Sequence, residues 1–494
     1  MRIAGIGIIL IITVGLAITG CERNDPLAEG PQYKLSFSTD TLLFDTVFTT
    51  VGSTTRTLTI YNPNDRKIRV SSIRLAGGSS SPFDLNIDGD AVTEIKDVEI
   101  EPGDSLFAFV RVTVDPTNAN SPLVITDSLV MFTNGNQQVV RLVAWGQDAH
   151  FFVGNKKLEG LSYKYLILAG ENETVEWIDD KPYVIYGWGV VDSSARLIIG
   201  PGCNIHFHQN SGLWVYRYGS IQVNGLPDSI VTFEGDRLDY AYRELPGQWD
   251  RIWINEGSVD NEFHNVLIKN GFIGLQAEIT SEDAGNALIL ENTTVRNMSR
   301  WGLFTIGYRV IAGNSVFANC SEQTAFLTVG GNYDFRHCTF AGYWNSSVRL
   351  EPSVVVSNNL TYYNADGQAI TLLGDLYARF GNCLITGNLD EELQFSNDAS
   401  VQFDLQFDHC GLTTLQEFSD PLFVNCFRNP DPKFVNVQWN NYRLDTLSAA
   451  INKGLPEIVT GGILDLTLDA DGNSRMEDEA PDLGAYEFIP EGSN

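Results

Sequence analysis

A charged loop between Glu234 and Trp249 gathers acidic and basic side chains at close spacing. Its candidate catalytic residues are Asp236, Arg237, Asp239 and Arg243. Carboxylates at such spacing can hold a calcium ion, and a basic side chain beside them can take part in proton transfer. Because a linear sequence does not show that these groups converge in one groove, a structural loop is the favoured interpretation and a catalytic site the alternative.

Four aromatic residues form a candidate ligand-binding site: Trp214, Tyr216, Tyr218 and Trp253. The two tryptophans alternate with apolar neighbours, and successive side chains of a strand point to opposite faces of a sheet. If the apolar neighbours face a core, these aromatic rings face outward and could form a platform on which sugar rings stack. The alternative is that a loop or another domain covers them.

The pair Asp469 and Asp471, in the sequence DADGNSR, is a weak candidate for a calcium site. An EF-hand loop needs a third oxygen ligand before its glycine and a later glutamate, and this stretch has neither. A turn is therefore the favoured interpretation, and calcium is the one cofactor that stays open. No CxxC or CxxH spacing, phosphate-binding glycine loop or HExxH motif occurs, which argues against zinc and nucleotide sites.

The start of the chain has the pattern of an export signal. A basic residue precedes an apolar run over residues 3–16, which is too short to span a membrane, and the sequence ITGC then ends at Cys21. This pattern resembles the lipobox of bacterial lipoproteins, in which the cysteine is acylated and becomes the mature N-terminus. The resemblance implies a signal peptide over residues 1–20, a lipid anchor on Cys21 and a polar tether over residues 21–33. A plain secretory signal is the alternative.

Charge limits the partners that the chain can have. The 494 residues carry a formal net charge of −30, with a pI near 4.4. A surface this negative argues against nucleic acid and against anionic membrane surfaces as partners.

A nine-residue pattern returns seven times between residues 263 and 412, for example as FHNVLIKNG and FGNCLITGN. A period of 21 to 27 residues with one short strand per repeat indicates a β-solenoid. Stacked strands about 4.8 Å apart would place the third residue of each repeat in one file, where each could bond its neighbours. These third residues are Asn265, Asn292, Asn314, His337, Asn358, Asn382 and His409.

Cysteine usage agrees with stacking. Three cysteines directly follow the aligned residue of a repeat, so we expect small, buried, reduced thiols in a file, although export would permit disulfides. The six cysteines beyond Cys21 are Cys203, Cys320, Cys338, Cys383, Cys410 and Cys426.

Residues 34–149 contain short alternating strands separated by Gly, Pro, Asn and Asp, which is typical of an antiparallel β-sandwich. The order VGSTTRTLTIYNP, IEPGDSLFAFVRVTVDP, VVRLVAWGQ resembles the immunoglobulin-like modules of bacterial surface proteins and of ciliary and spindle proteins. The resemblance implies a spacer or adaptor module. Residues 150–182 are expected to form a junction after it.

Residues 183–425 contain LIIGPG, GSIQVNG, DSIVTF and GQWDRIWI before the repeats, and resemble the right-handed parallel β-helix proteins related to pectate lyases. The resemblance implies an all-β chain in which such a helix follows the sandwich. Residues 426–494, with DPKF, SAAINKG and PDLGAYEF, resemble the terminal segment of β-helix proteins on bacterial surfaces, which implies terminal coils and a cap over the open end.

Together these features predict a lipoprotein of the outer membrane of a Gram-negative bacterium, either periplasmic or surface-exposed. It would bind a glycan or an envelope protein along the β-helix without catalysing a reaction. The alternative is a polysaccharide lyase or glycoside hydrolase that acts in a groove of the β-helix, with calcium if it works as pectate lyases do. We do not find the catalytic motifs of that family in this sequence.

Overall fold

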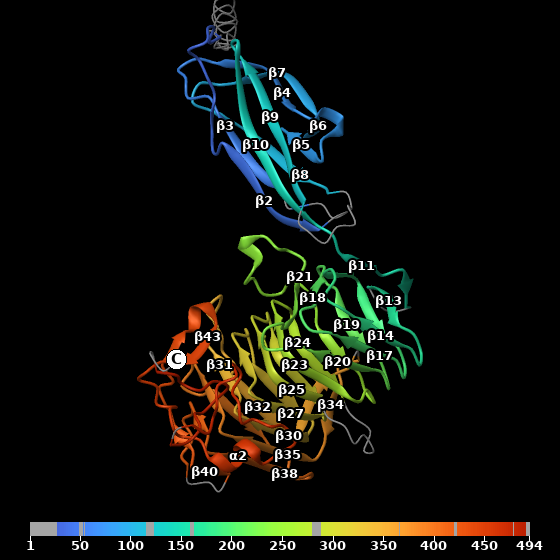
Figure 1. Cartoon of the computed structure of the whole chain (residues 1–494), viewed down its shortest axis with the longest axis vertical. Helices are drawn as coiled ribbons and strands as arrows, with labels where there is room; N and C mark the ends of the chain where they lie inside the picture. The colour runs from blue at the N-terminus through green and yellow to red at the C-terminus, as the bar shows by residue number, and fades with distance from the viewer. Residues whose placement is uncertain are drawn as a thin grey trace, which may run out of the picture. The chain divides into compact units, whose positions relative to one another are not determined.

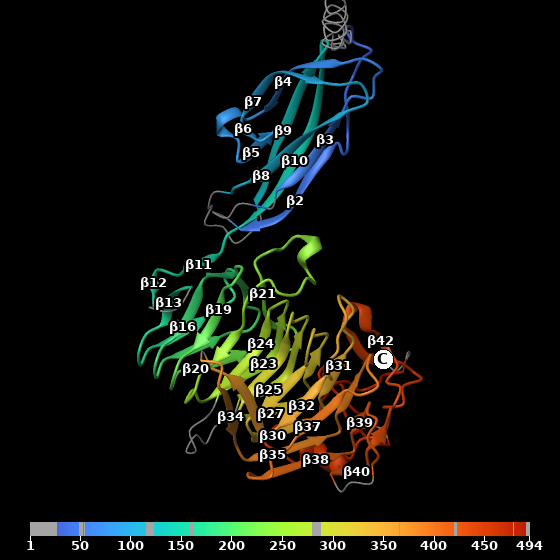
Figure 2. The same ribbon diagram turned by 180° about the vertical axis from the view of Figure 1, so that it is seen from behind.

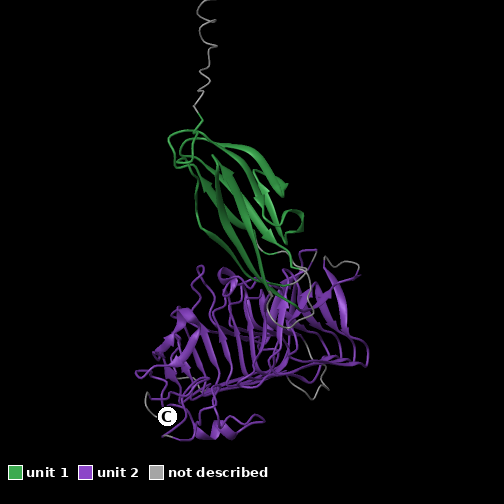
Figure 3. Cartoon of the chain, turned by 45° about the horizontal axis from the view of Figure 1, so that its top comes forward, with its two compact units in different colours: residues 1–148 green, residues 149–494 purple. Residues whose placement is uncertain are grey.

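The computed structural model describes residues 27–48, 53, 55–114, 123–158, 163–278, 288–364, 366–418, 422–477 and 479–490. The expected signal peptide and Cys21 lie outside these residues. Two compact units are present, Met1–Asp148 and Ala149–Asn494 (Figure 3). Strands dominate both, and no helix in the described part of the chain has the length and apolar character needed to cross a membrane.

The first unit consists of two five-stranded sheets. One has the order β1 (Ser36–Phe37), β3 (Arg56–Tyr61), β8 (Ser105–Val112), β5 (Phe83–Ile87), β6 (Asp90–Val92). The other has the order β2 (Thr41–Phe48), β10 (Asn136–Gln147), β9 (Leu123–Thr133), β4 (Ile68–Leu75), β7 (Glu94–Ile100). The pairing of β2 with β10 is parallel, and the neighbouring pairs, such as β10 with β9, are antiparallel. A short 3-10 helix, η1 (Gly78–Ser80), precedes β5.

Alternating residues explain how these two sheets pack. In β8, Ala108 and Val110 are buried, whereas Phe107 and Phe109 between and before them are exposed. Buried residues of both sheets belong to one apolar cluster, so the sheets pack against each other. The end of the expected tether joins this unit, because the N–H of Ala28 donates to the carbonyl of Lys67 at 2.7 Å.

The second unit contains a nineteen-stranded sheet and a ten-stranded sheet, both built mainly from parallel pairs (Figures 1 and 2). The larger sheet contains β11 (His150–Val153), β14 (Thr174–Trp177), β15 (Tyr183–Tyr186), β17 (Arg196–Ile199), β18 (Asn204–Phe207), β20 (Ser220–Asn224), β21 (Val231–Gly235), β23 (Asn261–Lys269), β25 (Leu288–Arg296), β27 (Arg309–Gly313), β28 (Val316–Ala318), β30 (Gly331–Arg336), β31 (Thr339–Gly342), β35 (Leu376–Gly381), β36 (Leu384–Gly387), β38 (Phe403–Asp408), β39 (Gly411–Leu412), β40 (Phe423–Val424) and β41 (Phe427–Arg428).

The ten-stranded sheet contains β12 (Lys156–Lys157), β13 (Lys164–Ala169), β16 (Trp188–Val191), β19 (Gly212–Val215), β22 (Ile252–Ile254), β24 (Ile273–Glu278), β26 (Trp301–Ile306), β29 (Ala325–Thr328), β32 (Val354–Ser357) and β37 (Leu393–Ser396). Two hairpins, β33 (Asn359–Tyr363) with β34 (Ala369–Leu373) and β42 (Phe434–Asn436) with β43 (Asn441–Leu444), lie outside both sheets. The remaining elements are η2 (Tyr240–Tyr242), η3 (Val437–Trp439) and α2 (Pro456–Thr460).

The chain passes through both sheets and then pairs with itself one level further along, and we call each such passage a coil. For example, β16 pairs with β19, and β19 pairs with β22, all in parallel. Inward side chains of successive coils form one continuous core, in which Phe380 stacks on Phe335 at 5.0 Å and on Phe407 at 4.7 Å. This all-β arrangement with large parallel sheets is compatible with a β-helix.

The parallel sheets begin earlier than the sequence suggested. The stretch 150–182, expected to be a junction, carries β11, β13 and β14, which pair with β15, β16 and β17. The short alternating segments HFFV, KYLILA and TVEW are the sequence signal for these strands.

A left-handed residue makes the same bend in successive coils of the larger sheet. Strand register aligns these residues, and their φ angles lie between 48° and 52°. Asparagine tolerates this conformation because its short polar side chain bonds locally. Asn292 Nδ2 donates to Asn265 Oδ1 at 3.2 Å, and Asn382 Nδ2 lies 2.9 Å from His337 Nε2. This bend file consists of Asn265, Asn292, Asn314, His337, Asn382, His409 and Asn425.

Asn358 was expected in this file and does not belong to it. β30 pairs directly with β35 and β31 with β36, so His337 is followed by Asn382. Asn358 instead lies between β32 of the ten-stranded sheet and the β33–β34 hairpin. Its segment matched the repeat in residue type alone, and Asn425 takes the last place in the file.

The terminal segment contacts the outer side of the bend file, and the expectation that residues 426–494 form terminal coils and a cap stays a prediction. Asn382 accepts from the N–H of Leu455 at 2.8 Å and donates to its carbonyl at 3.0 Å. Asn314 donates to the carbonyl of Leu468 at 2.8 Å. Arg475 is fully buried, pairs with Glu487 and donates to Asn314 Oδ1 at 2.8 Å.

Replacing Asn382 tests the bend file. Asn382→Ala should lower the free energy of unfolding by about 3 kcal/mol, because it combines left-handed strain with the loss of buried hydrogen bonds. Asn382→Gly removes the strain and should recover about 1 kcal/mol of that loss. Chemical denaturation measures both values. Asn388→Ala, at an exposed asparagine of the same unit, is the control, and an equal loss in Asn388→Ala and Asn382→Ala would contradict the role of the bend.

Candidate functional site

The four charged residues of the loop after β21 do not act as one group. Asp236 accepts a hydrogen bond from His208 Nδ1 at 2.7 Å, and this bond raises the pKa of His208. Arg237 Nε lies 3.3 Å from Asp239 Oδ2. The guanidinium of Arg243 lies 5.7 Å from the ring of Tyr240. The structure therefore brings Arg237 and Asp239 together, while Asp236 pairs with His208 of the sheet.

The four aromatic candidates are arranged differently from the expected platform. Strand register places Trp214 beside Trp253, and their rings stack at 5.0 Å with an interplanar angle of 9°. Tyr216 meets Trp214 edge-on at 5.4 Å. Tyr218 lies apart, in a turn, with a φ of 60° and 62% of its surface exposed. Trp214 and Trp253 therefore cover one face of each other, and their binding of sugar rings stays a prediction.

The oxygens of Asp469 and Asp471 are occupied by donors of the protein. Asp469 Oδ1 accepts from the N–H groups of Asp471 and Asn473 at 2.9 and 2.7 Å, and its Oδ2 accepts from the N–H of Glu487 at 2.7 Å. Asp471 forms a two-pronged pair with Arg443, with both distances at 2.5 Å. The stretch is thus a turn. Within the described ranges, no group of three or more His, Cys, Asp or Glu residues is placed to hold a metal ion.

The cysteines are free thiols throughout the described part of the chain. The register places Cys338, Cys383, Cys410 and Cys426 directly after successive members of the bend file. Burial raises the pKa of Cys383, which keeps this thiol protonated and inert.

A pocket of about 480 Å³ lies between the charged loop and the turn around η3. We call it the rim pocket. Two aromatic side chains stand at it with most of their surface in solvent, since Tyr240 is 72% and Trp439 is 71% exposed. The complete lining is Tyr240, Ala241, Arg243, Glu244, Leu245, Gln438, Trp439 and Asn440.

Local chain geometry holds Trp439 outward. Asn436 precedes η3 and its Oδ1 accepts from the N–H groups of Gln438 and Trp439 at 3.1 and 3.2 Å. Asn440 follows with a left-handed φ of 55°, which ends the 3-10 turn. The tryptophan is therefore presented by a short element capped at both ends.

A second file of left-handed asparagines anchors both walls of the rim pocket. Asn270 donates to the carbonyl of Arg243 at 2.8 Å, and Asn297 donates to Glu244 Oε2 at 2.5 Å. Asn319 donates to Asn297 at 2.6 Å and to Asn440 Oδ1 at 3.3 Å. Three successive coils thus fix the charged loop and the η3 turn in one rigid setting.

The carboxylate of Glu244 is bound by side chains of the coils and of the η3 turn. It pairs with Arg296, lies 3.5 Å from Lys269 Nζ and accepts from Asn440 Nδ2 at 3.4 Å. Burial alone would raise the pKa of Glu244, but its hydrogen bond and ion pair with Arg296 outweigh burial and lower it. The side chains of Arg243 and Gln438 line the pocket, where the guanidinium of Arg243 lies 5.7 Å from the ring of Tyr240.

Sequence reasoning selected the charged loop and missed Trp439. The sequence did contain an indication of this residue, because a tryptophan in the mostly polar stretch NVQWNN does not follow the apolar pattern of a buried strand. Its closeness to a loop almost 200 residues earlier follows only from the path of the terminal segment.

Comparisons with known proteins do not assign a family. No family model and no curated protein matches the chain. Among solved structures, a family 123 glycoside hydrolase from Clostridium perfringens is 9% identical over 24% of this chain and 30% of its own, with a TM-score of 0.18. The PapD-like domain 7 of human CEP192 is 12% identical over 25% of this chain and 90% of its own, with a TM-score of 0.17. A protein of unknown function from Porphyromonas gingivalis W83 is 14% identical over 28% and 59%, also at 0.17. Likenesses this partial support no statement about function.

The contact between His208 and Asp236 makes a prediction about pH. Because Asp236 raises the folded-state pKa of His208, its stabilisation is complete below the unfolded pKa of about 6.5 and is lost as pH rises through the raised value. Asp236→Asn should lower the pKa of His208, measured by NMR, and flatten this part of the stability profile. Asp180→Asn, which removes the partner of His150 at 2.8 Å, is the matched control. An unchanged pKa of His208 in Asp236→Asn would contradict the assignment.

Proposed function

We propose that this chain is an outer-membrane lipoprotein of a Gram-negative bacterium, anchored through Cys21, that binds a glycan at the rim pocket without cleaving it. Its first unit is an immunoglobulin-like module, and its second is a right-handed parallel β-helix. The observation that carries the proposal is that two strongly exposed aromatic side chains, Tyr240 and Trp439, line one pocket together with Arg243 and Gln438.

Open aromatic rings suit a sugar because the C–H face of a pyranose packs on a ring while its hydroxyls stay free for hydrogen bonds. The amide of Gln438 and the guanidinium of Arg243 supply donors for those hydroxyls. Because the asparagine file holds both walls in place, binding would cost little conformational entropy.

The charge of the chain favours a neutral glycan. A formal charge of −30 repels polyanions, so a polymer of uncharged sugars is the better match. Catalysis is not part of the proposal, because the carboxylate in the pocket, Glu244, is bound to Arg296 and Asn297.

Aromatic substitutions test the binding site. Trp439→Ala and Tyr240→Ala should each weaken binding of the full chain to a neutral polysaccharide at least tenfold, measured by titration against a panel of soluble glycans. Their unfolding free energy should change by no more than about 0.5 kcal/mol, because both rings are exposed.

Tyr363→Ala is the matched control, since Tyr363 is 74% exposed on the β33–β34 hairpin. Equal losses in all three variants would show that the rim pocket is not the site. Release of reducing or unsaturated sugar ends by the wild-type protein would replace the proposal with a hydrolase or lyase.

The anchor has its own test. In the native host, Cys21→Ser should move the protein from the membrane fraction to the soluble fraction and remove the acyl chains from its N-terminal peptide in mass spectrometry. A protein that stays in the membrane fraction with an unmodified Cys21 would refute the lipid anchor.

A further inference from the structure

The ten-stranded sheet ends before its larger neighbour does. Its last strand is β37, whereas the nineteen-stranded sheet continues with β38 to β41. In the described part of the chain β37 pairs with β32 alone. The N–H of Val354 donates to the carbonyl of Glu392 at 3.0 Å, so that carbonyl faces β32. By alternation, the backbone groups of Leu393 and Phe395 face away from β32. The N–H of Leu393 donates to Glu391 Oε1 at 3.3 Å, and the N–H of Glu392 donates to the carbonyl of Thr413 at 2.9 Å. Within the described chain, the carbonyl of Leu393 and both backbone groups of Phe395 are left at the edge.

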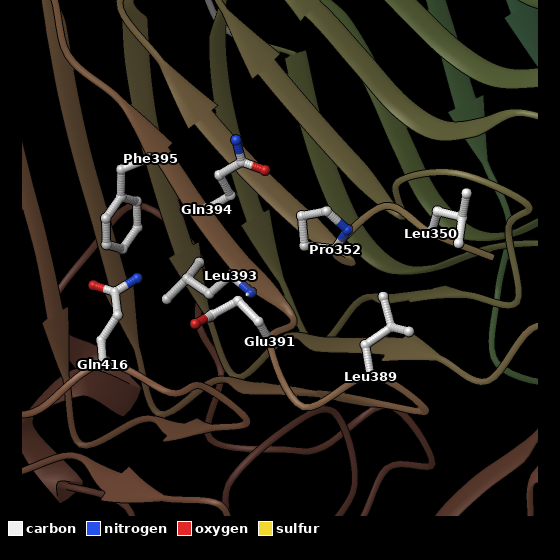
Figure 4. A pocket seen from close by; sticks show the side chains of 8 residues that line it. All are labelled: Leu350, Pro352, Leu389, Glu391, Leu393, Gln394, Phe395 and Gln416. Atoms are coloured by element: carbon white, nitrogen blue, oxygen red, sulfur yellow. Dashed lines mark hydrogen bonds between the residues drawn. The ribbon is translucent and has the colours of Figure 1, made fainter.

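A pocket of about 600 Å³ lies beside this edge, and we call it the edge pocket. Figure 4 shows its side chains coming from β37, from the loop before β32 and from the segments on either side. Apolar side chains nearby are strongly exposed, with Val348 at 83%, Leu350 at 81% and Leu415 at 62%. The lining is Leu350, Pro352, Leu389, Glu391, Leu393, Gln394, Phe395 and Gln416.

A buried ion pair holds the loop that carries Val348 and Leu350. Arg349 donates to both carboxylate oxygens of Glu392, at 2.9 and 2.5 Å, and the two side chains are 2% and 0% exposed. Ser353 Oγ donates to the same carboxylate at 2.6 Å. The loop is therefore fixed beside the edge with its apolar residues turned outward, and the pocket stays open.

The surroundings of the edge pocket are acidic. Glu391 lines it, and the neighbouring Glu351 and Asp390 are exposed. Of the nearby cations, Arg349 is buried against Glu392, and Arg428, beside Thr414, pairs with Glu417. A second copy of this chain would bring another −30 of charge against the same rim, which opposes self-association. A basic partner is favoured instead.

We propose that the edge pocket binds an extended segment of a partner protein in which apolar residues alternate with lysine or arginine. The segment adds as a strand to β37, where its backbone bonds the carbonyl of Leu393 and the N–H and carbonyl of Phe395. Its apolar side chains enter the pocket beside Leu350, and its basic side chains meet Glu351, Asp390 and Glu391. This site is independent of the rim pocket.

The test uses the full chain in detergent and a fluorescent peptide of alternating valine and lysine. Leu350→Ser should weaken binding at least tenfold, while Leu447→Ser, at a leucine that is 78% exposed elsewhere, should leave it unchanged. The double variant Glu351→Gln/Asp390→Asn should weaken binding severalfold, and added salt should do the same to the wild type. Hydrogen exchange should show new protection of residues 393–396 when the peptide is bound.

Peptides of alternating valine and glutamate, and of alternating serine and lysine, should each bind the wild type at least tenfold more weakly. Equal binding of either peptide overturns the stated chemistry of the partner. Equal losses in Leu350→Ser and Leu447→Ser, or no added protection of β37, overturn the site. A dimer in sedimentation that Leu350→Ser abolishes would make a second copy the occupant and refute the proposal.

Discussion

The second unit depends on one backbone bend that must recur in the same place in coil after coil. A left-handed residue costs free energy for most side chains, and asparagine reduces that cost by bonding locally. Once coils stack, some of these side chains also bond the next coil, as Asn292 does with Asn265 and Asn382 with His337. Local chemistry and long-range stacking therefore favour the same register, which a slip of one residue would destroy.

The same device positions the features that face solvent. One file of bends receives the terminal segment, through Asn314 and Asn382. The other file holds the walls of the rim pocket, through Asn270, Asn297 and Asn319. Loops in solenoids vary freely in sequence, but here their ends are tied to the most regular part of the structure.

Two buried arginines also hold loops against the sheets. Arg349 fixes the loop before β32 against Glu392, and Arg475 fixes the terminal segment against Glu487. Removing two charges from water is costly, so such pairs add little net stability by themselves. We infer that they act by specificity, because a displaced loop would leave a buried carboxylate, Glu392 or Glu487, without its arginine.

The features that repeat along the chain could be predicted from the sequence, whereas those set by contacts between distant residues could not. The period of the repeat gave six members of the bend file, but Asn358 fitted the pattern while an inserted hairpin moved it elsewhere. Alternation placed Trp214 beside Trp253, yet it could not show that the rings would cover each other. The terminal segment was recognised by its residues, whereas its path along the bends depends on partners such as Arg475 and Asn314.

That path has a consequence for how the protein is made. Arg475 meets Asn314 across 161 residues, so an interval separates the formation of the coils from the docking of the terminal segment. During this interval the outer apolar side chains of the middle strands, such as Ile311 and Leu384, lack their final neighbours. During this period a chaperone or protease can distinguish incomplete chains from folded ones by these exposed apolar side chains.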